Sequence, residues 1–107
     1  MVPLTGAALR AVVLRRPGFG KRGYAPEQVE AFLARAADAL DARAAGLAAG
    51  LTPEEVHFVV FAKPRMGRGR GYDEDHVDEL LDAVEAALRP DARPVSGVEL
   101  NGEPYRP

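Results

Sequence analysis

The sequence predicts a mainly α-helical fold in which two tandem helix-loop-helix repeats pack against each other as a pseudo-dimer. Three observations support this fold class. A pattern of helix caps, glycines and apolar residues occurs twice, with an offset of 47 residues up to Gly20 and Gly67 and of 48 from Gly23 and Gly71 onward. Helix-start signals open each repeat, and apolar residues spaced by three and four follow in its second half. A pattern used twice in this way indicates one supersecondary unit in two copies.

Length and composition are those of one ordinary globular domain. The chain has 107 residues, enough for one core but not for two. We expect a compact domain at 1–90, made of repeats 4–47 and 51–89, and a proline-rich tail at 91–107 in which Leu100–Glu103 has the composition of a tight hairpin. The chain has no cysteine, no apolar run long enough to span a membrane and no secretory signal. These absences fit a cytoplasmic protein.

Each repeat begins with the signal of a short helix. In the second repeat Thr52 is a suitable N-cap, Pro53 fits the first helical position, and Glu55 completes a capping box. The first repeat keeps the threonine, as Thr5, but lacks the proline and the glutamate.

Apolar, β-branched runs follow these first helices at 11–14 and 58–61. So short a run fits a last helical turn as well as an extended segment. The predicted fold therefore includes short β segments at these two places as an option, and leaves open whether they pair as strands.

A loop rich in glycine and basic residues joins the two helices of each repeat. Proline and three glycines in each loop interrupt the helical pattern. Each loop also carries one large hydrophobic residue among the lysines and arginines, a combination that suits contact with an anionic membrane surface or a partner protein. The alternative, in which these hydrophobic side chains fold back onto the helices, stays open. The candidate contact residues are Phe19, Lys21, Arg22, Met66, Arg68 and Arg70.

The second helix of each repeat has the clearest pattern. Asp73 is a good N-cap, whereas Ala25 takes this place in the first repeat, directly before Pro26. Ala25→Asp is therefore expected to stabilise the protein by about 1 kcal/mol. Because the second repeat keeps both caps, we expect it to fold more autonomously than the first. The apolar stripes are Val29, Phe32, Leu33, Ala36 and Leu40 in one helix, and Val77, Leu80, Leu81, Val84 and Leu88 in the other.

No residue pattern indicates catalysis, a cofactor or a metal. His76 is flanked by Asp75 and Asp78, but on a helix with one buried apolar face these side chains are expected to face solvent. The glycine-rich loops lack the lysine and serine of a phosphate-binding loop. The one serine, Ser96, has no histidine near it in the sequence. We predict no enzyme, and no catalytic, cofactor-binding or metal-binding residues.

One motif is specific enough to indicate a family. The second repeat contains Leu51-Thr52-Pro53, then Arg70-Gly71-Tyr72-Asp73, and then Val77-Asp78 before Leu80-Leu81-Asp82. The first repeat has Arg22-Gly23-Tyr24 at the matching offset. These residues resemble the N-terminal domain of the DivIVA family, and the resemblance covers about residues 4–88. The residues assigned to the structural motif are Gly23, Tyr24, Gly71, Tyr72 and Asp73.

The resemblance implies a bacterial protein of cell division or polar growth, cytoplasmic and peripheral to the inner face of the cell membrane. Domains of this family dimerise, bind curved membrane through the glycine-rich basic loop and recruit partners through long coiled coils. The family's arginine before Gly-Tyr corresponds to Arg22 and Arg70. Its membrane-inserting aromatic residue corresponds to Lys21 and Gly69, so Phe19 and its counterpart in the other loop would have to act from nearby positions.

Two functions of different classes follow. The first is a non-enzymatic, DivIVA-like interaction module that binds a partner protein, an anionic membrane surface or both through its two loops. The alternative is a small nucleic-acid-binding protein that uses the same loops. The net charge of −2 argues against this alternative, because dedicated DNA-binding domains are strongly basic. The pseudo-dimer within one chain is the simplest arrangement of the repeats, and a homodimer of two chains stays open.

Overall fold

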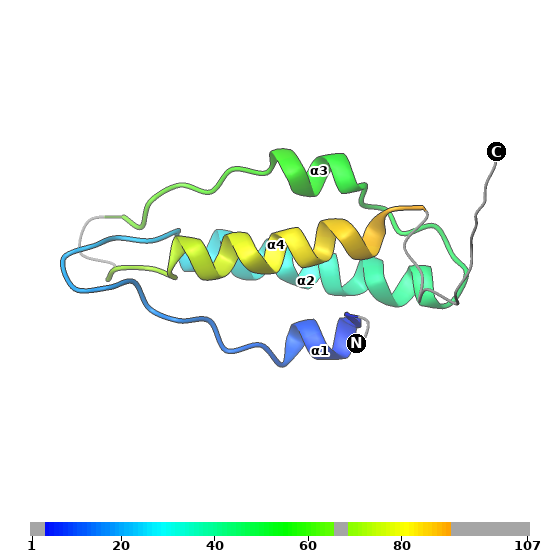
Figure 1. Cartoon of the computed structure of the whole chain (residues 1–107), viewed down its shortest axis with the longest axis horizontal. Coiled ribbons are helices and arrows are strands. Elements are labelled where there is room, and N and C mark those ends of the chain that lie inside the picture. Colours follow the sequence, from blue (N-terminus) through cyan, green and yellow to red (C-terminus); the bar gives the residue numbers. More distant parts are fainter. Residues whose placement is uncertain (1–3, 66–68, 91–107) are drawn as a thin grey trace, which may run out of the picture.

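Two long helices, lying side by side, form the centre of the molecule. The structure is a computed structural model that describes residues 4–65 and 69–90. The helices are α1 (Gly6–Arg10), α2 (Pro26–Ala44), α3 (Pro53–Phe58) and α4 (Glu74–Leu88). α2 and α4 run in the same direction, while α1 and α3 lie on opposite sides of this pair (Figure 1). The predicted mainly α-helical fold class is confirmed; the predicted tail hairpin lies outside the described residues.

The helices begin where the sequence predicts. The Thr52 hydroxyl accepts a hydrogen bond from the Glu55 N–H at 3.1 Å, and the Glu55 carboxylate accepts one from the Thr52 N–H at 2.9 Å. This reciprocal pair is the predicted capping box. Thr5 and Asp73 also cap their helices through the side chain, whereas Ala25 makes no such bond. The cap signals in the sequence are therefore confirmed.

Apolar side chains from all four helices form one core. α1 packs against α2, α3 packs against α4, and the two long helices contact each other. Val29, Val77 and Val84 are completely buried, and these residues belong to the predicted stripes. The core consists of Leu9, Val29, Ala36, Ala37, Ala39, Leu40, Leu51, Val56, Val77, Leu81, Val84 and Leu88.

The segments 11–14 and 58–61 do not form strands, so the β option is wrong. Phe58 is the last residue of α3, and the chain beyond Ala11 and Val59 has no regular secondary structure until the loops. The two segments lie on opposite sides of the α2–α4 pair, too far apart to pair with each other (Figure 1). We call residues 12–17 the first arm and residues 59–64 the second arm.

Each arm is fixed by the start of a long helix in the other repeat. In the first arm, the Arg15 N–H donates to Nδ1 of His76 at 3.0 Å, and the Arg15 carbonyl accepts from the Asp73 N–H at 2.8 Å. The second arm repeats both bonds, from the Ala62 N–H to Gln28 Oε1 at 2.8 Å and from the Ala25 N–H to the Ala62 carbonyl at 2.8 Å. Side-chain acceptors thus satisfy backbone donors that strand pairing would otherwise satisfy.

The structure changes the expectation for Ala25→Asp. Asp73, the equivalent residue, is paired with the Arg15 side chain at 3.0 Å, but the position equivalent to Arg15 is occupied by Ala62. Ala25 itself is buried, so a new carboxylate there would be partly desolvated without a cation beside it. We expect Ala25→Asp alone to gain less than about 1 kcal/mol. In thermal melts, the double variant with Ala62→Arg should exceed the sum of both single variants; strict additivity would contradict this pairing.

Candidate interaction surface

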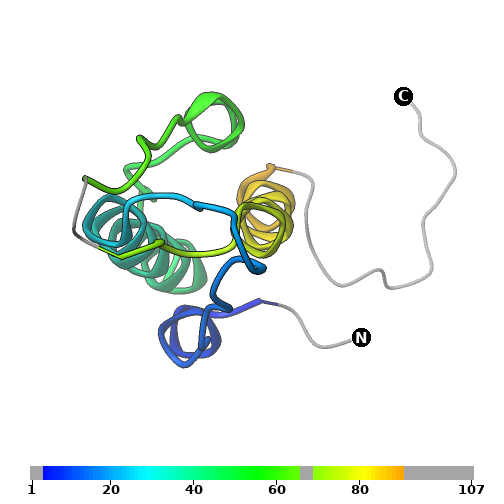
Figure 2. The same cartoon turned by 90° about the vertical axis from the view of Figure 1, so that its left-hand side faces the viewer.

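The two glycine-rich loops meet at the end of the molecule where α2 and α4 begin (Figure 1). Viewed from that end, the connections of the two repeats cross each other (Figure 2). Tyr24 and Tyr72 form an antiparallel backbone bridge, with N–H to carbonyl distances of 2.9 and 3.0 Å. The Gly23 N–H also donates to the Arg70 carbonyl at 2.6 Å. Among the residues that the structure describes, this bridge is the one place where backbone pairs in the manner of a sheet.

Two arginines tie the loops together. The Arg22 guanidinium donates to the Pro64 carbonyl of the other repeat. Arg70, at the equivalent position, donates to the Pro17 carbonyl at 2.5 Å. The sequence assigned both arginines to the contact surface; the structure places each in a cross-link between the repeats, where its charge still lies at the loop end.

The two motif tyrosines make equivalent hydrogen bonds across the repeats. The Tyr24 hydroxyl donates to Asp78 of α4 at 2.9 Å, and the Tyr72 hydroxyl donates to Glu30 of α2. Burial, and then the bond to Asp78, raise the pKa of Tyr24 to about 12. The bond to Glu30 is the main cause that raises the pKa of Tyr72. The protonated phenols therefore hold the two long helices to the bridge.

This arrangement predicts a loss of stability at high pH. The pKa of Tyr24 is higher in the folded chain, about 12, than the ordinary value of 10.0, so the folded state holds the proton more tightly. The stabilisation is complete below pH 10 and is lost as the pH rises toward 12. We expect the free energy of unfolding, measured with urea, to fall over this range. Tyr24→Phe should reduce the fall and Tyr24→Phe with Tyr72→Phe should reduce it further; an equal fall in all three proteins would exclude the tyrosines as its cause.

Asp73 joins helix capping to the contact between repeats. Its carboxylate accepts from the His76 N–H at 3.2 Å and from the Arg15 guanidinium at 3.0 Å. The bond to Arg15 is the main cause that holds the pKa of Asp73 below its usual value. The next arginine, Arg16, lies over the Tyr72 ring at 5.1 Å. The first arm is therefore attached to α4 by charge as well as by its backbone.

The outer surface of the loop end carries an exposed aromatic ring. The Phe19 side chain is 99% exposed, which excludes for this residue the alternative that it folds back onto the helices. Lys21, two residues further along the same loop, and Arg65, in the loop of the other repeat, are also exposed, and neither side chain has a hydrogen bond or ion pair within residues 4–65 and 69–90. Met66 and Arg68, which the sequence assigned to this surface, lie outside the described residues.

Sequence reasoning missed two residues of this surface. The predicted contact set lacks Arg65, whose side chain has no partner within the part of the chain that the structure describes, although its position in the basic loop was a usable signal. Arg16 is also absent from the predicted contact set. Its place over Tyr72 depends on the crossing of the arms, which no local sequence pattern predicts.

The described part of the chain shows no feature of a metal site or of a membrane span. No group of three or more histidine, cysteine, aspartate or glutamate side chains within it could hold a metal ion. None of its helices combines the length and the apolar character needed to cross a bilayer.

Comparison with known proteins finds one local similarity. A stretch of 38 residues is 58% identical to a protein described as cell wall synthesis protein Wag31 in Mycobacterium tuberculosis, Mycobacterium leprae and Mycolicibacterium smegmatis. No family model matches the chain, and no solved structure matches it. The matched stretch makes up 36% of this chain and 14% of each Wag31 protein. The chain therefore shares with Wag31 one closely similar segment and spans only a small part of that protein's length.

Proposed function

We propose that this protein is a non-enzymatic, DivIVA-like interaction module that binds an anionic membrane surface, and partner proteins at that surface, through its loop end. The similarity to Wag31, a cell wall synthesis protein, supports the resemblance to the DivIVA family and a role in bacterial cell division or polar growth. The observation that carries the proposal is the full exposure of Phe19 in a loop rich in basic residues. An aromatic ring so placed loses no packing in the protein when it enters the interface of a bilayer.

The charge distribution agrees with this proposal. Lys21 and Arg65 have no partner in the described residues, so headgroup phosphates would meet them without competition from an internal ion pair. Basic residues near an anionic surface strengthen binding by roughly fivefold each. Arg22 and Arg70 add charge to the same end while their hydrogen bonds keep the two loops together.

Removal of the exposed ring tests the proposal. Phe19→Ser should reduce binding to phosphatidylglycerol vesicles by roughly tenfold to a hundredfold, because burial of a phenylalanine side chain contributes about 1.5–3 kcal/mol. Co-sedimentation with vesicles measures the bound fraction. Val60→Ser is the matched control, since Val60 is 85% exposed but lies on the second arm; it should bind like the unchanged protein.

Charge and salt provide the second half of this test. Lys21→Gln combined with Arg65→Gln should weaken binding to anionic vesicles and leave the weak binding to neutral phosphatidylcholine vesicles unchanged. Equal loss in Phe19→Ser and Val60→Ser, or no binding to anionic vesicles at low salt, would remove the membrane from the proposal. Salt-sensitive binding to RNA without any binding to vesicles would instead favour the nucleic-acid alternative.

A further inference from the structure

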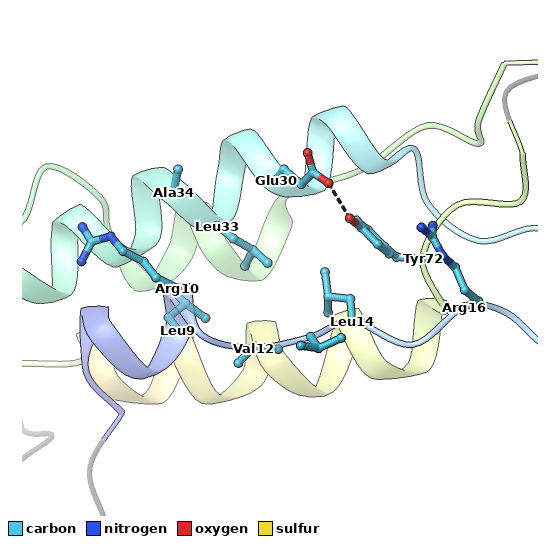
Figure 3. A pocket seen from close by; sticks show the side chains of 10 residues that line it. Leu9, Arg10, Val12, Leu14, Arg16, Glu30, Leu33, Ala34 and Tyr72 are labelled. Atoms are coloured by element: carbon cyan, nitrogen blue, oxygen red, sulfur yellow. Dashed lines mark hydrogen bonds between the residues drawn. The ribbon is translucent and has the colours of Figure 1, made fainter.

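A groove open to solvent lies between the first arm and α2. Its volume is about 570 Å³, within the range of sites that accept small molecules or the side chains of a bound segment. Leu9, Leu14 and Leu33 contribute apolar walls, and Arg10 and Arg16 lie at its two ends (Figure 3). The groove lies along the side of the molecule, so it is separate from the exposed ring of the loop end.

The other repeat shows which side chain fits at the equivalent place. Phe61 stands in the second arm where the first arm has Leu14. Its ring centroid lies 5.3 Å from that of Tyr24 and 5.9 Å from that of Phe32. Leu14 supplies no ring beside Tyr72, the equivalent of Tyr24, and both residues line the groove. An aromatic side chain from outside would restore beside Tyr72 the packing that Phe61 gives to Tyr24.

The arginines at the two ends of the groove have different partners. Arg10 is paired with two aspartates of α2, at 2.7 and 2.8 Å. Among the described residues Arg16 has only neutral partners, because it donates to the Gly71 carbonyl at 3.2 Å and lies over the Tyr72 ring. The acidic residue of the wall, Glu30, already accepts the hydrogen bond of Tyr72. The guanidinium of Arg16 therefore keeps donors for a carboxylate brought by a ligand.

The first arm also offers free backbone groups. Within residues 4–65 and 69–90, no hydrogen bond reaches the N–H or the carbonyl of Val13 or Leu14. The Val13 side chain is 86% exposed. Extended backbone with unused donors and acceptors is a template for the addition of another extended segment.

We propose that this groove binds an extended segment of a partner protein, with an aromatic side chain beside Tyr72 and a carboxylate against Arg16. The proposal concerns a different surface from the loop end and does not depend on membrane binding. Since Phe61 fills the equivalent place in the other repeat, each chain is expected to bind one such segment.

The direct test is a titration of the full chain with a short peptide, followed by nuclear magnetic resonance. The probe is the acetylated and amidated tetrapeptide Ser-Phe-Glu-Ser. We expect saturable shifts centred on Val12, Val13, Ala34 and Tyr72. Peptides with alanine in place of phenylalanine, or lysine in place of glutamate, should bind roughly tenfold more weakly. Shifts centred on Phe19, or equal affinity for all three peptides, would overturn the proposal.

Two variants locate the binding. Leu14→Phe gives the first arm the residue that the second arm already has, so we expect a native melting temperature and about tenfold weaker peptide binding. Leu47→Phe, at a position that is 68% exposed, is the matched control and should bind normally. Arg16→Gln should abolish the preference for glutamate over lysine, and this result decides the question if Leu14→Phe does not fold. Unchanged affinity in folded Leu14→Phe, or an unchanged preference in Arg16→Gln, would refute the site.

Discussion

Gly23→Ala is expected to lower the free energy of unfolding by about 3 kcal/mol. A Cβ atom at position 23 would lie 1.7 Å from the carbonyl oxygen of Tyr72 and 2.5 Å from its carbonyl carbon. These atoms belong to the backbone, and the hydrogen bonds between Tyr72 and Tyr24 hold them in place. The loops would have to separate to admit the methyl group, and the bridge would be lost. Urea denaturation measures the change.

Gly18→Ala is the matched control for this substitution. A Cβ at Gly18 meets no atom within 4 Å, and Gly18 does not have a positive φ, so stability should stay within about 0.5 kcal/mol of the unchanged protein. Gly71→Ala should be as damaging as Gly23→Ala, because its Cβ would lie 2.3 Å from the Tyr24 carbonyl oxygen and its φ is +81°. If Gly23→Ala were as harmless as Gly18→Ala, the crossing of the loops would be placed wrongly.

The sequence predicts the local features of this fold well. Helix starts can be found from a single sequence, because the capping side chains bond to backbone within three residues of themselves. The examples here are the capping box of Thr52 and Glu55, and the cap by Asp73. The density of glycine in the loops likewise indicates close backbone approach, and Gly23 and Gly71 make such approaches.

The contacts between the repeats could not be predicted in this way. Arg22 and Arg70 carry the signature of solvent-exposed cations, yet both donate to carbonyls more than 40 residues away. Gln28 and His76 occupy equivalent positions and differ in chemistry, but the side chain of each accepts a hydrogen bond from a backbone N–H of an arm. This role depends on where the arms lie in the fold, so the sequence alone does not indicate it. Apolar runs such as 11–14 left a strand open as an option, because periodicity records which side chains are buried and not which backbone groups are paired.

The second prediction with a large expected effect concerns the folding of each repeat when it is separated from the other. The caps alone led us to expect a more autonomous second repeat, but the contacts between the repeats change this expectation: residues 51–90 alone are expected to be unfolded. Val77 and Val84 are completely buried in a core shared with α2, and the second arm bonds to Ala25 and Gln28 of the first repeat. A piece of this size is also near the limit of about 40 residues below which a core alone seldom supports a fold. Far-ultraviolet circular dichroism should show little helix.

Mixing the halves separates the role of contacts between repeats from that of local propensity. Residues 1–50 and 51–90 together should regain the helical signal at a one-to-one ratio, because the tyrosine bridge, both arginine cross-links and the arm contacts all join one half to the other. A strong helical signal from 51–90 alone that does not change with concentration would show that the caps suffice and would contradict the expectation. A signal that rises with concentration would show self-pairing. Self-pairing should be weaker than pairing with 1–50, since Ala62 would then face Asp73 in place of Arg15.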